Sequence, residues 1–231
     1  NLNDELTQRL AQNGNGNAAY IDSLLEAKKV LVDELGGTLF PIANDVKIQV
    51  EFNPAQVAEY RLLGYETRIL EREDFNNDHV DAGEIGNGHN VTAIYEIVPV
   101  TAQFRWMGGL RYDDGPALEP DDRFAGELAY LKIRYKLPGE DTSKLISRPV
   151  SNEQVIASLE EAPGDVRFSI AVAAYGQLLR NDAFLQTYDF GDVVDLANAS
   201  RGKDSFGYRA EFVRLADLAG TLDNRWSSLN E

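Results

Sequence analysis

The spacing of apolar residues changes twice along the chain, and these changes divide it into three parts. In the first part, apolar residues recur three or four positions apart over residues 4–11 and 24–35, which predicts two short helices. The run 18–21 between them predicts a brief strand. Residues 1–43 therefore have the order helix, strand, helix, which is the usual end of an open α/β sheet.

From residue 45 the period becomes two, which predicts strands. In the first strand, over residues 46–52, the apolar positions are expected to be buried and the polar positions to face water. The apolar ones are Val46, Ile48, Val50 and Phe52, and the polar ones are Lys47, Gln49 and Glu51. Further strands are predicted through residues 60–65, 91–98 and 131–137, with loops over 74–90 and 108–122. We expect residues 44–160 to form an antiparallel β-sandwich.

The last seventy residues return to helical spacing, with helices predicted over 165–179, 190–197 and 206–222, the first capped by Asp165. Each long helix has an apolar stripe that we expect to be buried. The stripes are Phe168, Val172, Tyr175 and Leu179 in the first helix, and Tyr208, Phe212, Leu215, Ala219 and Leu222 in the last. Residues 161–231 are thus predicted to be a helical region packed on the sandwich, and the fold class is α+β.

Composition narrows the classes of partner. The 231 residues include 22 Lys and Arg against 38 Asp and Glu, a net charge of −16, and a chain of that sign repels nucleic acid. It has no Cys, which excludes thiolate chemistry, and no apolar run long enough to span a membrane. The first residue is Asn and no signal peptide follows it, so we expect a fragment of a longer protein.

One segment has the spacing of a metal loop. Asp74, Asn76 and Asp78 stand at the first, third and fifth positions of a calcium-binding loop of the EF-hand type, and Asp81 and Glu84 follow. The rest of that pattern fails, because its sixth position is not Gly and its twelfth is not Glu. A regular EF-hand is therefore not expected, and the first interpretation is a set of turns closed by Asp and Asn side chains. The alternative is an irregular calcium or magnesium site, for which these five residues are the candidate ligands.

Catalytic machinery is not visible in the sequence. No nucleophile elbow or His-Glu-x-x-His helix occurs, and the two histidines, His79 and His89, both lie in the Asn- and Gly-rich loop. We expect no enzyme and assign no catalytic or cofactor-binding residue. A carboxylate-dependent hydrolase is the alternative, and it requires the loop carboxylates to converge on one cleft.

Several runs of the sequence carry a family resemblance. Residues 15–32 resemble the last strand and helix of a von Willebrand factor type A domain. The later runs resemble the C-terminal region of YfbK-like bacterial proteins, and they are residues 46–54, 60–66, 72–78, 80–86, 91–97, 134–139, 178–180 and 207–212. This resemblance implies a preceding type A domain and a location at the cell envelope. The Asp-x-Ser-x-Ser metal loop of type A domains is absent from this sequence, so no metal ligand is carried over from them.

These observations give three hypotheses for function. The first is a non-catalytic protein-binding or assembly module, which acts as a stalk or second contact surface for an unidentified protein partner. The alternatives are the carboxylate-dependent envelope hydrolase and a calcium-stabilised structural domain. Because residues 1–43 end a sheet whose other strands are missing from the sequence, we also expect self-association through them, or refolding of the first forty residues onto the sandwich.

Overall fold

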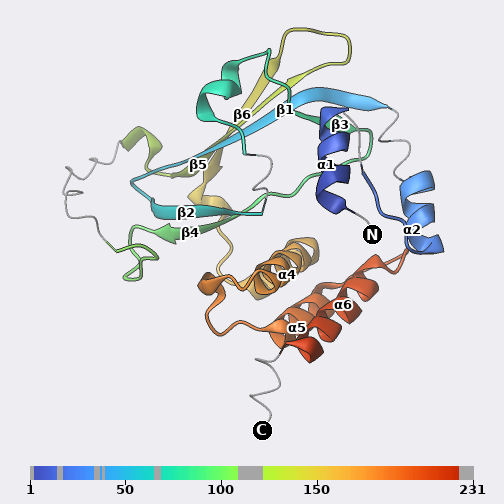
Figure 1. Cartoon of the computed structure of the whole chain (residues 1–231). Helices are drawn as coiled ribbons and strands as arrows, with labels where there is room; N and C mark the ends of the chain where they lie inside the picture. Colours follow the sequence, from blue (N-terminus) through green and yellow to red (C-terminus); the bar gives the residue numbers. More distant parts are fainter. Residues whose placement is uncertain are drawn as a thin grey trace. The chain divides into compact units, whose positions relative to one another are not determined.

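The computed structural model describes residues 3–14, 18–33, 37, 40–64, 69–108 and 122–223. The chain divides into two compact units that alternate along the sequence. Unit 1 comprises residues 1–49, 70–91 and 132–146, and unit 2 comprises residues 50–69, 92–131 and 147–231. Helices occur together with antiparallel strand pairs (Figure 1), which confirms the α+β class. The boundaries predicted after residues 43 and 160 fall inside single elements of the structure, strand β1 at Pro41–Phe52 and the 3-10 helix η5 at Leu159–Glu161.

The predicted N-terminal helices are present, and the strand between them is not. Helix α1 covers Asp4–Asn13 and begins at Asn3, whose Oδ1 accepts from the backbone N–H of Leu6 at 3.1 Å. Helix α2 covers Leu24–Lys28 and continues as a π-helical turn, η1, over Lys29–Asp33. Residues 18–21 form no strand, because an extended segment becomes a strand only when a neighbour accepts its hydrogen bonds.

The strands form two sheets. The larger sheet has the order β3-β1-β5-β6, with β1 at Pro41–Phe52, β3 at Gly83–Gly86, β5 at Glu127–Lys136 and β6 at Lys144–Ser151. The smaller sheet pairs β2, Val57–Leu63, antiparallel with β4, Ile94–Pro99. Strands β1, β2, β4 and β5 occur where alternation predicted them. Strands β3 and β6 were not predicted, since β3 is four residues long with Gly at both ends and β6 contains Pro149.

The burial predicted for β1 is wrong at two neighbouring positions. The side chain of Lys47, which was expected to face water, is buried at 3% exposure, whereas Ile48 is 45% exposed. The ammonium of Lys47 is buried because a loop of unit 1 supplies carbonyl oxygens to it, as the next subsection describes.

The three predicted C-terminal helices are α4, Gly164–Leu179, α5, Phe190–Ser200, and α6, Tyr208–Leu222. Helix α5 packs against both α4 and α6 (Figure 1). Most buried residues of this bundle are small, and the buried core is Ala171, Ala174, Leu178, Phe190, Val193, Ala197 and Ala216. Small side chains let the helix axes approach closely, so the alanine-rich faces of the helices are the ones turned inward.

This packing corrects two further predictions. In α6 the inward face carries Ala216 and Gly220, and two members of the predicted buried stripe, Leu215 and Leu222, are 50% and 73% exposed. In α4, Val172 and Leu179 were also predicted to be buried, and they are 43% and 56% exposed. The predicted cap is also wrong, because Pro163 precedes the first turn of α4 and no side chain caps it.

Candidate functional site

The loop that carries the predicted metal ligands is held by cations of the chain itself. Lys47 Nζ of β1 donates to the backbone carbonyls of Asp74, at 3.3 Å, and of Asn77. Lys136 Nζ of β5 donates to the carbonyl of Asp78 at 2.7 Å. Two ammonium groups thus satisfy loop oxygens from the neighbouring strands β1 and β5.

A guanidinium completes this arrangement in unit 1. Arg134 Nη2 donates to Asn76 Oδ1 at 3.0 Å, and Arg134 Nη1 donates to Ser143 Oγ at 2.7 Å. Its guanidinium also lies 5.7 Å from the ring centre of Phe75, which is 4% exposed. Arg134 and Lys136, which alternate along β5, therefore both fix this loop.

Three carboxylates lie around Lys136, and their pKa values shift in different directions. Hydrogen bonds from Ser143 lower the pKa of Asp78. For Asp45, burial would raise the pKa, but the hydrogen bonds from Lys136, at 2.7 Å, and from the N–H of Ala82, at 3.2 Å, together with the charge of Lys136, outweigh it and lower the pKa. Partial desolvation and the neighbouring Asp45 carboxylate raise the pKa of Asp81.

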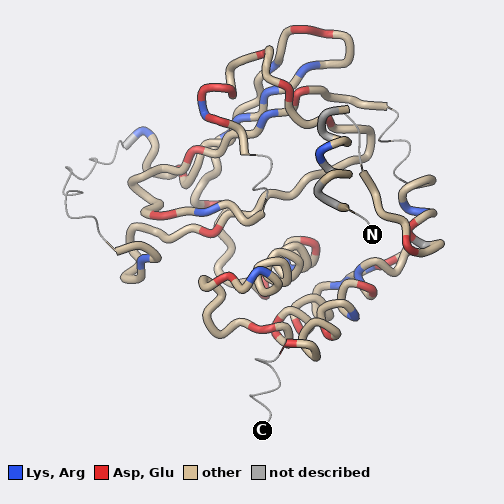
Figure 2. The backbone as a smooth tube through the Cα atoms, viewed as in Figure 1, with Lys and Arg blue, Asp and Glu red and all other residues tan. Residues whose placement is uncertain are grey.

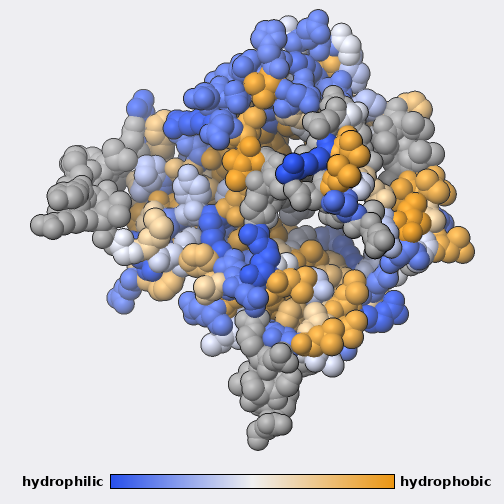
Figure 3. All heavy atoms as spheres, in the orientation of Figure 1, coloured by the Kyte–Doolittle hydropathy of each residue, from blue (hydrophilic) through white to orange (hydrophobic). Residues whose placement is uncertain are grey.

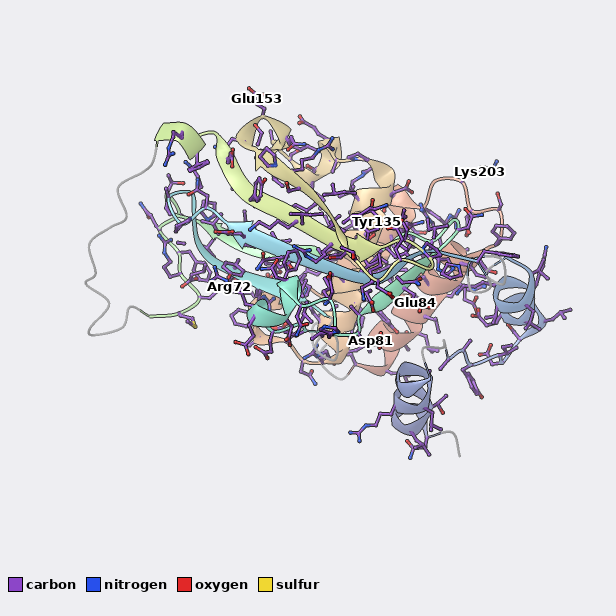
Figure 4. The ribbon with its side chains drawn as sticks, turned by 90° about the horizontal axis from the view of Figure 1, so that it is seen from above. Arg72, Asp81, Glu84, Tyr135, Glu153 and Lys203 are labelled. Carbon is purple, nitrogen blue, oxygen red and sulfur yellow. The ribbon has the colours of Figure 1, made fainter. Side chains whose placement is uncertain are left out.

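The structure does not gather the five predicted ligands around one point. Asp74 and Asp78 present backbone carbonyls to lysines, Asn76 accepts from Arg134, and Asp81 and Glu84 lie at separate positions on either side of the start of β3 (Figure 4). Among the described residues, no group of three or more His, Asp or Glu side chains is placed to hold a metal ion. Instead, Lys47 and Lys136 donate to backbone carbonyls of the loop, and Arg134 donates to the Asn76 side chain.

A second polar cluster, in unit 2, is centred on Arg61 of β2. Its Nε pairs with Glu96, the residue directly opposite it on β4. Its Nη1 donates to Asp182 Oδ2 at 2.7 Å, and its Nη2 donates to Gln177 Oε1 of α4 at 2.6 Å. The guanidinium also lies 4.1 Å from the ring centre of Phe184, in the short 3-10 helix η6 at Ala183–Leu185.

These contacts join the β2–β4 pair to α4 and η6 through one side chain. Burial would lower the pKa of Arg61, and the hydrogen bonds and charges of Glu96 and Asp182 raise it instead. Burial likewise opposes ionisation of Asp182, yet the N–H of Phe184 and the guanidinium of Arg61 lower its pKa. A charge cluster satisfied in this way holds these elements of unit 2 together.

Helix α6 presents a row of exposed leucines, which we call the α6 leucine face. It consists of Leu215, Leu218 and Leu222, which are 50%, 55% and 73% exposed. Their spacing of three and four residues places them on one side of the helix, opposite the buried Ala216 and Gly220. Figure 3 shows apolar side chains at the surface of this helical part. Exposed apolar rows of this kind are characteristic of surfaces that contact another protein.

The sequence indicated these sites unequally. It identified the acidic loop by its spacing, but Lys47 was expected to face water and Arg61 was not singled out. Leu215 and Leu222 of α6 were assigned to the buried stripe, and Leu218 was not part of that prediction. No signal within the helix distinguishes its two apolar faces, except that the buried one is rich in Ala and Gly.

Comparison with known proteins identifies the family. Residues 37–222 match the family described as "Uncharacterized protein YfbK, C-terminal", and the chain belongs to it. The chain is 44% identical over 219 residues, 95% of its length, to the protein named "Uncharacterized protein YfbK" of Escherichia coli (strain K12). It spans 37% of the length of that relative. No solved structure matches the chain. Within the described residues, no helix is both long enough and apolar enough to cross a membrane.

Proposed function

We propose that this chain is a non-catalytic protein-binding module of a bacterial protein of the von Willebrand factor type A class, located at the cell envelope. It acts as a second contact surface beside the type A domain. The observation that carries the proposal is the α6 leucine face, since three leucines of one helix side are half or more exposed. Burying one such side chain against a partner contributes about 2 kcal/mol.

The polar clusters support the same function. In the loop of unit 1, the charged groups bond other groups of the same cluster, and the same holds within the Arg61 cluster of unit 2. We take these contacts to hold the backbone in place. A carboxylate-dependent hydrolase requires loop carboxylates that act across one cleft, whereas Asp81 and Glu84 lie at separate positions around the start of β3 (Figure 4). A calcium-stabilised domain requires loop oxygens that are free for the ion, and lysines donate to three carbonyls of this loop.

Affinity capture with the complete bacterial protein tests the proposal. Leu218→Glu places a charge in the α6 leucine face, and Asn198→Glu adds the same charge at an exposed position of α5 outside that face. We expect the wild type and Asn198→Glu to capture the same protein and Leu218→Glu to lose it, with calcium or with a chelator. Capture that is equal for all three proteins would overturn the assignment of this face, and capture that requires calcium would favour the calcium-stabilised alternative.

A further inference from the structure

A groove of about 350 Å³ lies in unit 2 between the 3-10 helix η5, Leu159–Glu161, and helix α5. Its apolar lining comes from Leu159, Leu196 and Ala199. This volume is at the lower end of ligand-binding pockets, so it has room for one or two side chains and not for a large cofactor.

The groove is also negatively charged. Asp192 and Asp195 line it from the side of α5 that carries Leu196 and Ala199, because these four positions are three or four residues apart, and Glu160 lines it from η5. Figure 2 marks the acidic residues of α5. The lining contains three carboxylates and one cation, Arg167.

Two of the carboxylates differ in what they bond. Asp192 Oδ2 accepts from the backbone N–H of Asp189 at 2.9 Å, in the capping box that begins α5. Asp195 is exposed and has no hydrogen bond or ion pair with any described residue. Tyr188 lines the same groove, and its pKa is raised. Burial is the main cause, and the negative charges of Asp192, Asp189 and Asp195 add to it.

We propose that this groove binds a lysine or arginine side chain from a segment of the partner protein. Both side chains have an apolar stem, which fits against Leu159 and Leu196, and a cationic head, which fits beside Asp195. A bare metal ion does not suit the groove, because no three acidic groups of the described residues are placed to hold one. A net charge of −16 further favours approach of a basic partner.

This inference rests on the proposed protein-binding function and names the chemistry of the partner. The test uses a fluorescein-labelled octapeptide of alternating arginine and leucine, with alternating glutamate and leucine as the reference peptide, in about 0.15 M salt to screen long-range attraction. Fluorescence anisotropy is measured with the whole chain. Asp195→Lys reverses the charge in the groove, and Asp217→Lys makes the same change at an exposed position of α6 outside it.

We expect the wild type to bind the basic peptide and not the acidic one, with Kd raised about tenfold by Asp195→Lys and less than about twofold by Asp217→Lys. Equal weakening by both variants, or no binding to the wild type, would overturn the groove assignment. Leu218→Glu separates this result from the proposed function, because it leaves the groove intact. If the peptide fails to bind while capture still depends on Leu218, only the groove inference falls.

Discussion

Arg61 connects strands β2 and β4 of unit 2 to helix α4 and to the segment that follows it. No sequence pattern around Arg61 indicates these contacts. Its charged partners Glu96 and Asp182 are 35 and 121 residues away in the sequence, and Gln177 is 116 residues away. The sequence predicted a strand through residues 60–65 and singled out no role for this arginine. Its role depends on long-range packing, and a single sequence does not contain that information.

We expect Arg61→Ala to destabilise the chain by about 3 kcal/mol, because removal of one partner leaves Glu96 and Asp182 poorly solvated without a cation. Urea unfolding followed by circular dichroism measures the change. Arg148→Ala is the matched control, since Arg148 is exposed and has no ion pair with the described residues. A loss for Arg61→Ala no larger than that of the control would contradict the role given to this cluster.

Asp182 gives the cluster a dependence on pH. Its pKa in the folded state lies below the ordinary 3.8, so its ionised form stabilises the fold above about pH 4, and this contribution is lost as pH falls through the folded pKa. Asp182→Asn removes the charge and keeps an oxygen that accepts from the N–H of Phe184. We expect the melting temperature of the variant to lie below that of the wild type at pH 7 and to approach it near pH 2. A difference that stays constant with pH would be inconsistent with this pKa shift.

At the scale of elements, prediction succeeded where local pattern and tertiary packing agree. Strands β1 and β5 alternate over long runs, and their existence was predicted, although the burial of Lys47 and the exposure of Ile48 in β1 were not. Helix α6 was also predicted, but it is apolar on two sides, and packing selected the side with Ala216 and Gly220. Lys47 is buried because it donates to carbonyls of the loop at residues 74–78, a contact that no local rule anticipates.

Capping of α5 provides a prediction at this scale. Asp189 accepts from the N–H of Asp192 at 3.1 Å, and Asp192 accepts from the N–H of Asp189, so each satisfies a donor of the first turn. We expect Asp189→Ala to lower the free energy of unfolding by about 1 kcal/mol. Asp195→Ala, in the same helix but without a bond to the described residues, is expected to change it by less than about 0.5 kcal/mol. Chemical denaturation of both variants checks the difference.

At the scale of the whole molecule, the region before β1 keeps large apolar side chains in contact with water. Leu24 is 88% exposed, Val32 65% and Leu31 56%, and these lie in or directly after α2. Leu6 and Leu10 of α1 are 53% and 63% exposed. Self-association through residues 1–43 was predicted from the sequence. The exposed side chains supply an apolar surface on which a second copy of the chain can pack.

We therefore expect the isolated chain to self-associate through residues 1–43, with a mass in light scattering that rises with concentration. Leu24→Glu combined with Leu31→Glu should return it to the monomer mass, because two charges in a small apolar contact remain desolvated and unpaired. Leu218→Glu is the control, and if α6 were the self-contact it would give the monomer instead. A wild-type chain that stays monomeric at every concentration would show that these side chains tolerate water, and the helical segment before β1 would then need no partner.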